Sequence, residues 1–338
     1  MGFLVREINE SDLDKLMALA KQFTLLNLPD DKTVLREKIE RSMKSFAGQL
    51  KKEDTEYIFA LEDTENGNLV GTSLILGKHG SPDSPHHYFK IEKRDRFSED
   101  LGVGFIHQVL SFHSDTDGPT EIGGLLVDYH YRRRPEKLGR IISLIRFVYM
   151  AMFPEKFEKR ILCELTPPLG EDGRSDFWEA LGRRFTGLPY QEADQLSQNH
   201  KEFITSLFPP EDIYVCLLES KARLVIGRVG EKTKPAQHLL EKIGFEYINE
   251  IDPFDGGPHY ACDLDKVSVV ANGSWSKYKK SSSAQFQEHG LVGAMVDGEF
   301  RAASTPLSIE NEHVSVPQNT ENLLKIDDSQ DIFYSVLN

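Results

Sequence analysis

The residues best suited to chemistry form a basic loop that follows a short apolar run ending at Val127. Five lysines and arginines fall between Arg132 and Arg140. Gly139 lies where a helix is expected to begin, and the first backbone N–H groups of a helix bind anions. The pattern therefore predicts a site for a phosphate-bearing ligand. A solvated basic turn is the alternative that the residues alone leave open.

Helices and strands predicted by periodicity must position this loop. Strands are expected over 5–8, 57–61, 69–76, 122–127, 161–165 and 245–251, and helices from Ser11, over 33–46, over 139–153 and from Thr233 to Ile243. The pair Asn66-Gly67 predicts a tight hairpin turn in which both residues have positive φ. Residues 77–118 are expected to form long loops and short strands. The order predicts an α/β (α+β) fold with a mixed central sheet.

The chain is expected to have two parts. Asp176 and Glu179 are spaced like a capping box in the first part. After Ser274 a linker-like run from Lys277 to Ala284 precedes a segment that alternates with period two. Residues 1–274, which could contain two lobes, are therefore predicted as the main domain and 275–338 as a small β-rich appendage.

Composition narrows the class of protein. The formal net charge of −14 opposes binding to a phosphate backbone, so no nucleic-acid partner is expected. Three widely spaced cysteines indicate reduced thiols, and no segment is apolar enough to span a bilayer. A cytoplasmic protein without a membrane partner is expected, and a homo-oligomer stays open.

Two motifs resemble the GNAT superfamily of N-acetyltransferases. Arg134-x-x-Lys137-x-Gly139 is similar to its pyrophosphate loop, with Lys137 where the middle glycine is usual. Further on, the helix from Pro235 ends in Gly244-Phe245, as the superfamily's helix does. The resemblance implies a GNAT-like acyltransferase fold.

A closer resemblance, to the arginine N-succinyltransferase family, covers nearly the whole chain. Its landmarks include Val5-Arg6 with Ser11-Asp12-Leu13, the string from Asp176 to Gly182, Glu192-Ala-Asp194, and the string from Ile251 to Pro258. The resemblance implies transfer of a succinyl group from the co-substrate succinyl-CoA to the α-amino group of L-arginine, in arginine metabolism.

The resemblance also implies which residues hold the acyl donor. It places the acyl-CoA contact at Leu125, where a splayed strand would free a backbone N–H to stabilise the tetrahedral oxyanion. The predicted donor-binding residues are Leu125, Val127, Arg132, Arg134, Lys137, Gly139 and Arg140.

The family's proposed proton donor is a histidine, and this chain has Gly230 at that position. Glu231 and Glu164 are the candidate catalytic residues, and His238 and Tyr214 are further nearby substitutes for the donor. Each is also explained as an ordinary surface, helix-start or strand-end side chain. Thiolate is a good leaving group, so loss of the acid is expected to slow the reaction without abolishing it.

The predicted substrate-binding turn contains Asp255, Gly256 and Gly257, because a carboxylate there suits a guanidinium. An aspartate that only satisfies turn backbone is the alternative. No metal is expected: the run from His113 to Gly118 lacks the ligands of a calcium loop, and His86-His87-Tyr88 is interpreted as a polar loop.

Two alternatives to the implied activity stay open. The protein could use another amine or acyl group, or it could be a non-catalytic binder of acyl-CoA or arginine. Gly139 is intact, which favours the enzyme.

Overall fold

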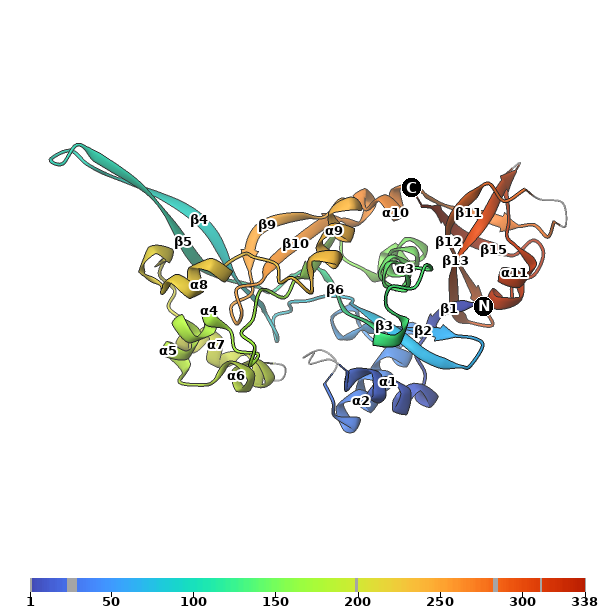
Figure 1. Cartoon of the computed structure of the whole chain (residues 1–338), viewed down its shortest axis with the longest axis horizontal. Helices are drawn as coiled ribbons and strands as arrows, with labels where there is room; N and C mark the ends of the chain where they lie inside the picture. The colour runs from blue at the N-terminus through green and yellow to red at the C-terminus, as the bar shows by residue number, and fades with distance from the viewer. Residues whose placement is uncertain (1, 23–28, 198–199, 282–284, 311, 338) are drawn as a thin grey trace. The chain divides into compact units, whose positions relative to one another are not determined.

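The computed structural model describes residues 2–22, 29–197, 200–281, 285–310 and 312–337 (Figure 1). Its contacts form two compact units, which are described separately. Unit 1 contains residues 1–78, 120–161 and 263–338, and unit 2 contains residues 79–119 and 162–262. No helix within these described ranges is both long and apolar enough to cross a membrane.

The first strands of unit 1 form an antiparallel stretch of sheet with helices on both faces (Figure 1). These strands are β1 (Phe3–Glu7), β2 (Glu56–Asp63), β3 (Asn68–Leu76) and β6 (Thr120–Val127), and the main helices are α1 (Leu13–Ala20), α2 (Lys32–Phe46) and α3 (Leu138–Met152). Apolar side chains of α1 and α2 pack on one face, against Ile58 and Leu74. Tyr149 of α3 packs on the other face, against Tyr57 and Phe59. Nearly every residue of β2 and β3 is buried, because successive side chains point to opposite faces and helices cover both.

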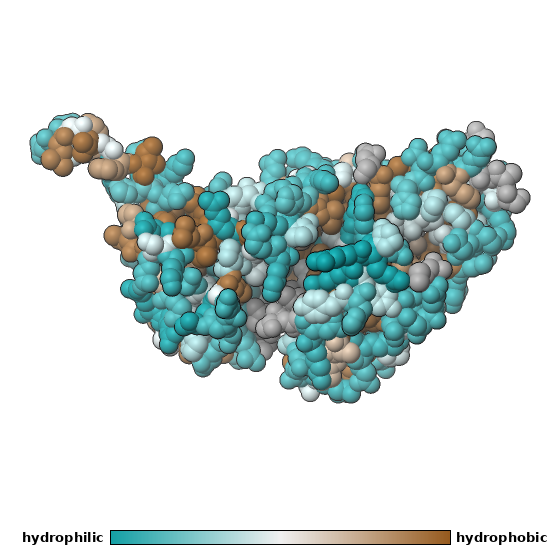
Figure 2. All heavy atoms as spheres, viewed as in Figure 1, coloured by the Kyte–Doolittle hydropathy of each residue, from teal (hydrophilic) through white to brown (hydrophobic). Residues whose placement is uncertain are grey.

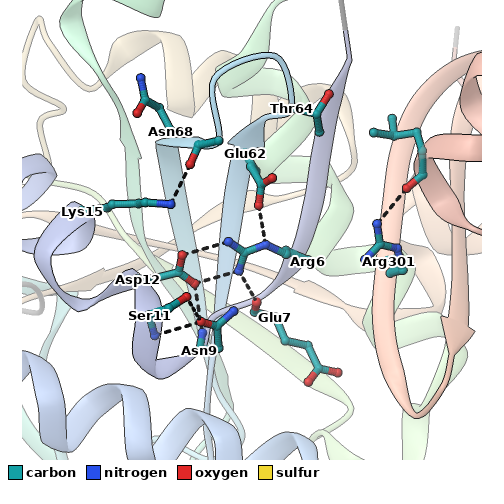
Figure 3. Close-up of polar contacts among 12 residues, drawn as sticks. Arg6, Glu7, Asn9, Ser11, Asp12, Lys15, Glu62, Thr64, Asn68 and Arg301 are labelled. Atoms are coloured by element: carbon teal, nitrogen blue, oxygen red, sulfur yellow. Dashed lines mark hydrogen bonds and ion pairs between the residues drawn. The ribbon is translucent and has the colours of Figure 1, made fainter.

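A buried ion-pair network ties β1 to the start of the first helical segment (Figure 3). Arg6 donates two hydrogen bonds to Asp12, at 2.7 and 2.8 Å, and a third to Glu62 at 2.7 Å. Asp12 is fully buried and also accepts from the backbone of Asn9. Because a buried carboxylate needs such partners, the landmark pairing of Arg6 with Asp12 is explained by structure alone.

The C-terminal part of unit 1 is β-rich, as predicted. It contains α10 (Ser268–Ala271), β11 (Gly273–Tyr278), β12 (Glu288–Val296), β13 (Glu299–Glu310), β14 (His313–Ser315), α11 (Gln318–Leu324) and β15 (Asp331–Val336). β11 and β14 run parallel while the other pairs are antiparallel, so the sheet is mixed. β13 pairs with β1, in the register Val5 opposite Ala302, so the contacts do not divide the chain at 274/275. The predicted boundary between 1–274 and 275–338 stays a prediction, and residues 282–284 of the predicted linker lie outside the described residues.

Unit 2 combines an antiparallel sheet with a cluster of short helices. The strands are β4 (His86–Ser98), β5 (Val103–Asp115), β8 (Ile213–Tyr214), β9 (Glu246–Ile251) and β10 (Pro258–Asp263). Strand β7 (Arg160–Glu164) belongs to this unit from Leu162 onward. The helices are α4 (Asp176–Ala180), α5 (Gly182–Thr186), α6 (Tyr190–Ser197), α7 (Glu202–Leu207), α8 (Ser220–Val225) and α9 (Lys234–Lys242). Trp178 of α4 is fully buried and stacks on Phe254 with ring centroids 5.0 Å apart. Two family landmarks thus meet in one core.

The prediction of loops and short strands over 77–118 is wrong. β4 and β5 are 13 residues each and form a long hairpin (Figure 1). Apolar side chains near its tip are exposed: Phe97, Phe105 and Ile106 are 71, 62 and 69% exposed, and Figure 2 shows brown patches among teal and white at this end of the hairpin. Since this part of the hairpin packs on no core, its sequence lacks the one-sided alternation that marks a half-buried strand.

Two local predictions also need correction. Only Gly67 has positive φ in the β2–β3 turn, because the connection runs over four residues rather than two. Helix α4 is capped by Ser175, whose hydroxyl accepts from the backbone of Trp178, so the cap lies one residue before the predicted capping box.

Candidate functional site

The strand ahead of the basic loop carries a β-bulge where the acyl-donor contact was predicted. Thr72 lies opposite Leu126 and Leu74 opposite Gly123, so Gly124 and Leu125 together face one residue of β3. Gly124 has φ +56, and a Cβ there would lie 2.7 Å from the Leu74 side chain. A bulge leaves backbone groups outside the ladder, so the half-buried Leu125 is at the point where β6 can offer backbone to a ligand.

The basic loop leads directly from this strand into α3. Aromatic rings hold its arginines: the Arg132 guanidinium lies 4.3 Å from the Tyr129 ring, and the Arg134 guanidinium 4.9 Å from the Tyr131 ring. Arg132 also donates to the carbonyl of Val127 at 3.0 Å. The exposed charges are therefore partly fixed in place before any ligand binds.

Lys137 adopts the conformation that glycine usually provides. Its φ and ψ are 55° and 50°, in the left-handed region, and it caps the N-terminus of α3. This explains why the superfamily motif favours glycine at this position, and it supports the predicted alignment of the motif. Gly139 lies in the first turn of α3, where an added Cβ would meet only the Val127 side chain, at 3.8 Å. Arg140 follows it in the same turn and is half-buried.

The position of the family's proton donor has no room for a side chain. Gly230 donates its N–H to the Thr166 carbonyl at 2.9 Å. A Cβ on Gly230 would lie 2.8 Å from the carbonyl oxygen of Pro167. Backbone packing, rather than a positive φ, therefore dictates glycine here.

The substitutes predicted near Gly230 are engaged elsewhere. The Glu231 side chain is 85% exposed and forms an ion pair with Lys234. Tyr214 accepts from Arg96 at 2.9 Å, and His238 donates to the Lys234 carbonyl at 2.7 Å. These contacts are those of ordinary side chains near the start of helix α9 and at the end of strand β8.

Glu164, at the end of β7, lies among histidines. His86 Nδ1 is 3.8 Å and His259 Nε2 is 3.5 Å from Glu164 Oε1, and His79 Nε2 is 3.3 Å from His86 Nδ1. His86 and His259 are buried, with exposures of 3% and 0%. Burial lowers the pKa of His86 well below its usual range, so this ring is neutral. Sequence reasoning missed His79 and His259, and it interpreted His86 as part of a loop although it begins β4.

The Asp255 turn brings carboxylates of two family landmarks together. Asp255 Oδ1 accepts from the Gly257 backbone at 2.7 Å, and Asp252 Oδ1 accepts from Asp255 N at 2.9 Å. Burial raises the pKa of both carboxyls, and it raises the pKa of Asp194 to about 8. Within the ranges that the structure describes, none of the three carboxylates has an ion-pair partner.

Both glycines of this turn are required by packing. Gly256 has φ +77 and lies against the Phe177 ring, and a Cβ on Gly257 would lie 2.5 Å from the Leu165 carbonyl oxygen. The turn therefore has the backbone role that was the alternative to substrate binding, and substrate binding by it stays a prediction.

Comparison with known proteins identifies the family to which the chain belongs. The family model described as arginine N-succinyltransferase beta subunit matches residues 3–269. A relative from Citrobacter koseri named arginine N-succinyltransferase is 36% identical over 270 residues, 79% of this chain and 78% of that protein. One of the same name from Shigella boydii serotype 18 is 35% identical over 285 residues, 83% of this chain and 82% of that protein.

A solved structure, of arginine/ornithine succinyltransferase subunit AI from Pseudomonas aeruginosa, has a TM-score of 0.85 and 27% identity, and it covers 100% of this chain and 99% of that one. With the bulged strand, basic loop and following helix, this match defines a protein with the α/β fold of a succinyltransferase subunit, and an α/β fold was predicted. More narrowly, the chain belongs to the arginine N-succinyltransferase family.

Proposed function

We propose that this protein transfers the succinyl group of succinyl-CoA to the α-amino group of L-arginine. The observation that carries the proposal is the bulge at Gly124 and Leu125, directly ahead of a basic loop and helix α3, in a chain of this family. In the transfer a nitrogen–carbonyl bond forms, the carbonyl–sulfur bond breaks, the amine loses a proton, and the leaving thiolate takes one up.

On the donor side, backbone supplies the main chemistry. A backbone N–H at the bulge by Leu125 would stabilise the oxyanion, and the first N–H groups of α3 would bind the pyrophosphate, with Gly139 allowing close approach. Val127 packs beside Gly139 and so shapes this junction. The cationic residues proposed to bind phosphates are Arg132, Arg134, Lys137 and Arg140.

On the amine side, we favour Glu164 over Glu231 as the group that takes the amine proton. Glu164 is half-buried and lies within 4 Å of two buried imidazoles, whereas Glu231 is exposed and paired with Lys234. Glu164→Gln is expected to lower kcat about 10²–10⁴-fold, the usual contribution of a general base, while Glu231→Gln stays near wild type. A large loss of kcat in Glu231→Gln, with Glu164→Gln near wild type, would identify Glu231 as the base instead.

For the guanidinium we propose the carboxylates of Asp255 and its neighbours Asp194 and Asp252, held by the turn at Gly256 and Gly257. A half-buried set of carboxylates without an ion-pair partner among the described residues is stabilised when a cation arrives. Asp255→Asn is expected to raise KM for arginine more than KM for succinyl-CoA.

The decisive experiment is a thiol-release assay that combines several acyl-CoAs with several amines. The highest kcat/KM is expected for succinyl-CoA with arginine, and turnover with alanine should be far slower. Equal turnover with alanine and arginine would refute a guanidinium pocket. Tight acyl-CoA binding without turnover for any amine would favour the non-catalytic alternative.

We also propose a cytoplasmic location, which the small number and wide spacing of the cysteines support. A homo-oligomer stays a prediction that light scattering can test.

A further inference from the structure

The cluster around Glu164 has the composition of a metal site. His79, His86 and Glu164 each place one donor atom within 4.8 Å of the other two. All three residues belong to unit 2, so their geometry does not depend on the second unit. Two imidazoles and one carboxylate are a donor set that binds zinc and related divalent transition ions.

The separations between the donor atoms suit one ion. Zinc bonds to nitrogen and oxygen ligands are about 2.0–2.2 Å long, so ligand atoms around a tetrahedral zinc lie roughly 3.3–3.6 Å apart. His79 Nε2 and His86 Nδ1 are 3.3 Å apart, and His86 Nδ1 and Glu164 Oε1 are 3.8 Å apart. The third pair, His79 and Glu164, lies within 4.8 Å, so side-chain movement of up to about 1 Å would bring all three donor atoms to zinc-binding distance.

A fourth residue points to an ion independently. His259 is 0% exposed, and neither of its ring nitrogens has a hydrogen-bond partner. Its Nε2 faces Glu164 Oε1 at 3.5 Å, and its Nδ1 faces Glu250 Oε2 at 3.9 Å. Carboxylates that bind a metal are themselves hydrogen-bonded by residues of the second coordination shell, and His259 is positioned to take this role once Glu164 turns toward an ion.

We propose that His79, His86 and Glu164 bind a divalent transition-metal ion, with zinc the best fit, and that His259 orients Glu164 toward it. The half-buried His79 and Glu164 give the ion a path from solvent, while His86 anchors the site in the interior. The ion would tie the segment before β4 to the end of β7 and stabilise unit 2. Because Glu164 is also proposed to take up a proton during transfer, the test measures metal binding and not turnover.

The test uses the full chain, prepared without a histidine tag and stripped with a chelator, in a Cys216→Ser background. Cys216 is exposed with its sulfur 3.7 Å from His107 Nδ1, so its removal eliminates a competing thiol site. Calorimetry with Zn²⁺ is expected to give one site per chain, with a rise in melting temperature on Zn²⁺ addition. Co²⁺ should produce visible bands of a tetrahedral nitrogen and oxygen site without thiolate charge transfer.

Variants identify the ligands. His79→Gln is expected to weaken Zn²⁺ binding by more than the roughly 10–100-fold that loss of a second-shell residue costs, and His259→Gln by about that amount. His113→Gln, an exposed histidine of the same unit, is the matched control and should bind as the parent does. Equal Zn²⁺ affinity in the parent and His79→Gln, or no Zn²⁺ binding by the folded parent, would overturn the proposal.

Discussion

Lys137 offers a test of the donor loop in which conformation and charge can be separated. Its left-handed backbone costs a residue with a Cβ about 1–2 kcal/mol. Lys137→Gly and Lys137→Ala both remove the ammonium group, but only glycine relieves this strain. Glycine adds about 0.4–1 kcal/mol of unfolded-state entropy, so the glycine variant is expected to be more stable than the alanine variant by about 1 kcal/mol.

Calorimetric titration with CoA measures the effect of removing the lysine charge on CoA binding. An exposed ammonium–phosphate contact contributes about 0.2–1 kcal/mol, so both variants should bind CoA roughly 1.5–5-fold more weakly than wild type, and less so at high salt. Lys137→Arg keeps both charge and strain and serves as the control. Denaturant unfolding in which the alanine variant equals or exceeds the glycine variant would refute the conformational argument. Unchanged CoA affinity in both variants would remove Lys137 from the phosphate site.

The remaining predictions concern the donor helix, the missing acid and the guanidinium pocket. Gly139→Val should leave the melting curve unchanged, since its Cβ has open space beyond Val127, but weaken CoA binding about tenfold or more because one charge-assisted hydrogen bond contributes about 1.5–3 kcal/mol. Unchanged CoA affinity on calorimetry would exclude this helix start as the phosphate site. Gly230→His should lower stability by about 1–3 kcal/mol without raising kcat, because the added Cβ meets backbone. A variant that melts like wild type and turns over faster would contradict this. The pKa of Asp194 is raised to about 8, so its carboxylate is charged only above that pH, and arginine should bind more tightly as pH rises through 8. Calorimetry at several pH values checks this against Asp194→Asn, in which that dependence should be weaker; identical profiles would exclude Asp194.

The elements with one buried face could be predicted because their patterning is local. α2 was expected over 33–46 and spans Lys32–Phe46, since apolar residues such as Leu35 and Ile39 recur with helical spacing. The β4–β5 hairpin escaped prediction for the opposite reason. Its outer half, with Phe97 and Ile106 exposed, contacts no core and so carries no alternation imposed by burial.

The candidate site divides in the same way. The donor loop is contiguous in sequence, so the basic run and Gly139 could be found by inspection. The cluster of Glu164 with His79, His86 and His259 forms only when unit 2 folds, because Glu164 and His259 are far in the sequence from His79 and His86. No spacing along the chain encodes such a juxtaposition.

The loss of the family histidine and the position of Glu164 are connected through strand β7. The Gly230 N–H is bonded to the carbonyl of Thr166, two residues beyond Glu164, and the Pro167 carbonyl fills the space that a side chain at 230 would need. The backbone that excludes a histidine at 230 therefore continues directly from the strand end that carries a carboxylate among imidazoles. Because thiolate leaves readily, the step that needs assistance is removal of the amine proton, and that requires a base rather than an acid. A chain with glycine at position 230 can therefore still catalyse the transfer if Glu164, at the end of β7, takes up the amine proton.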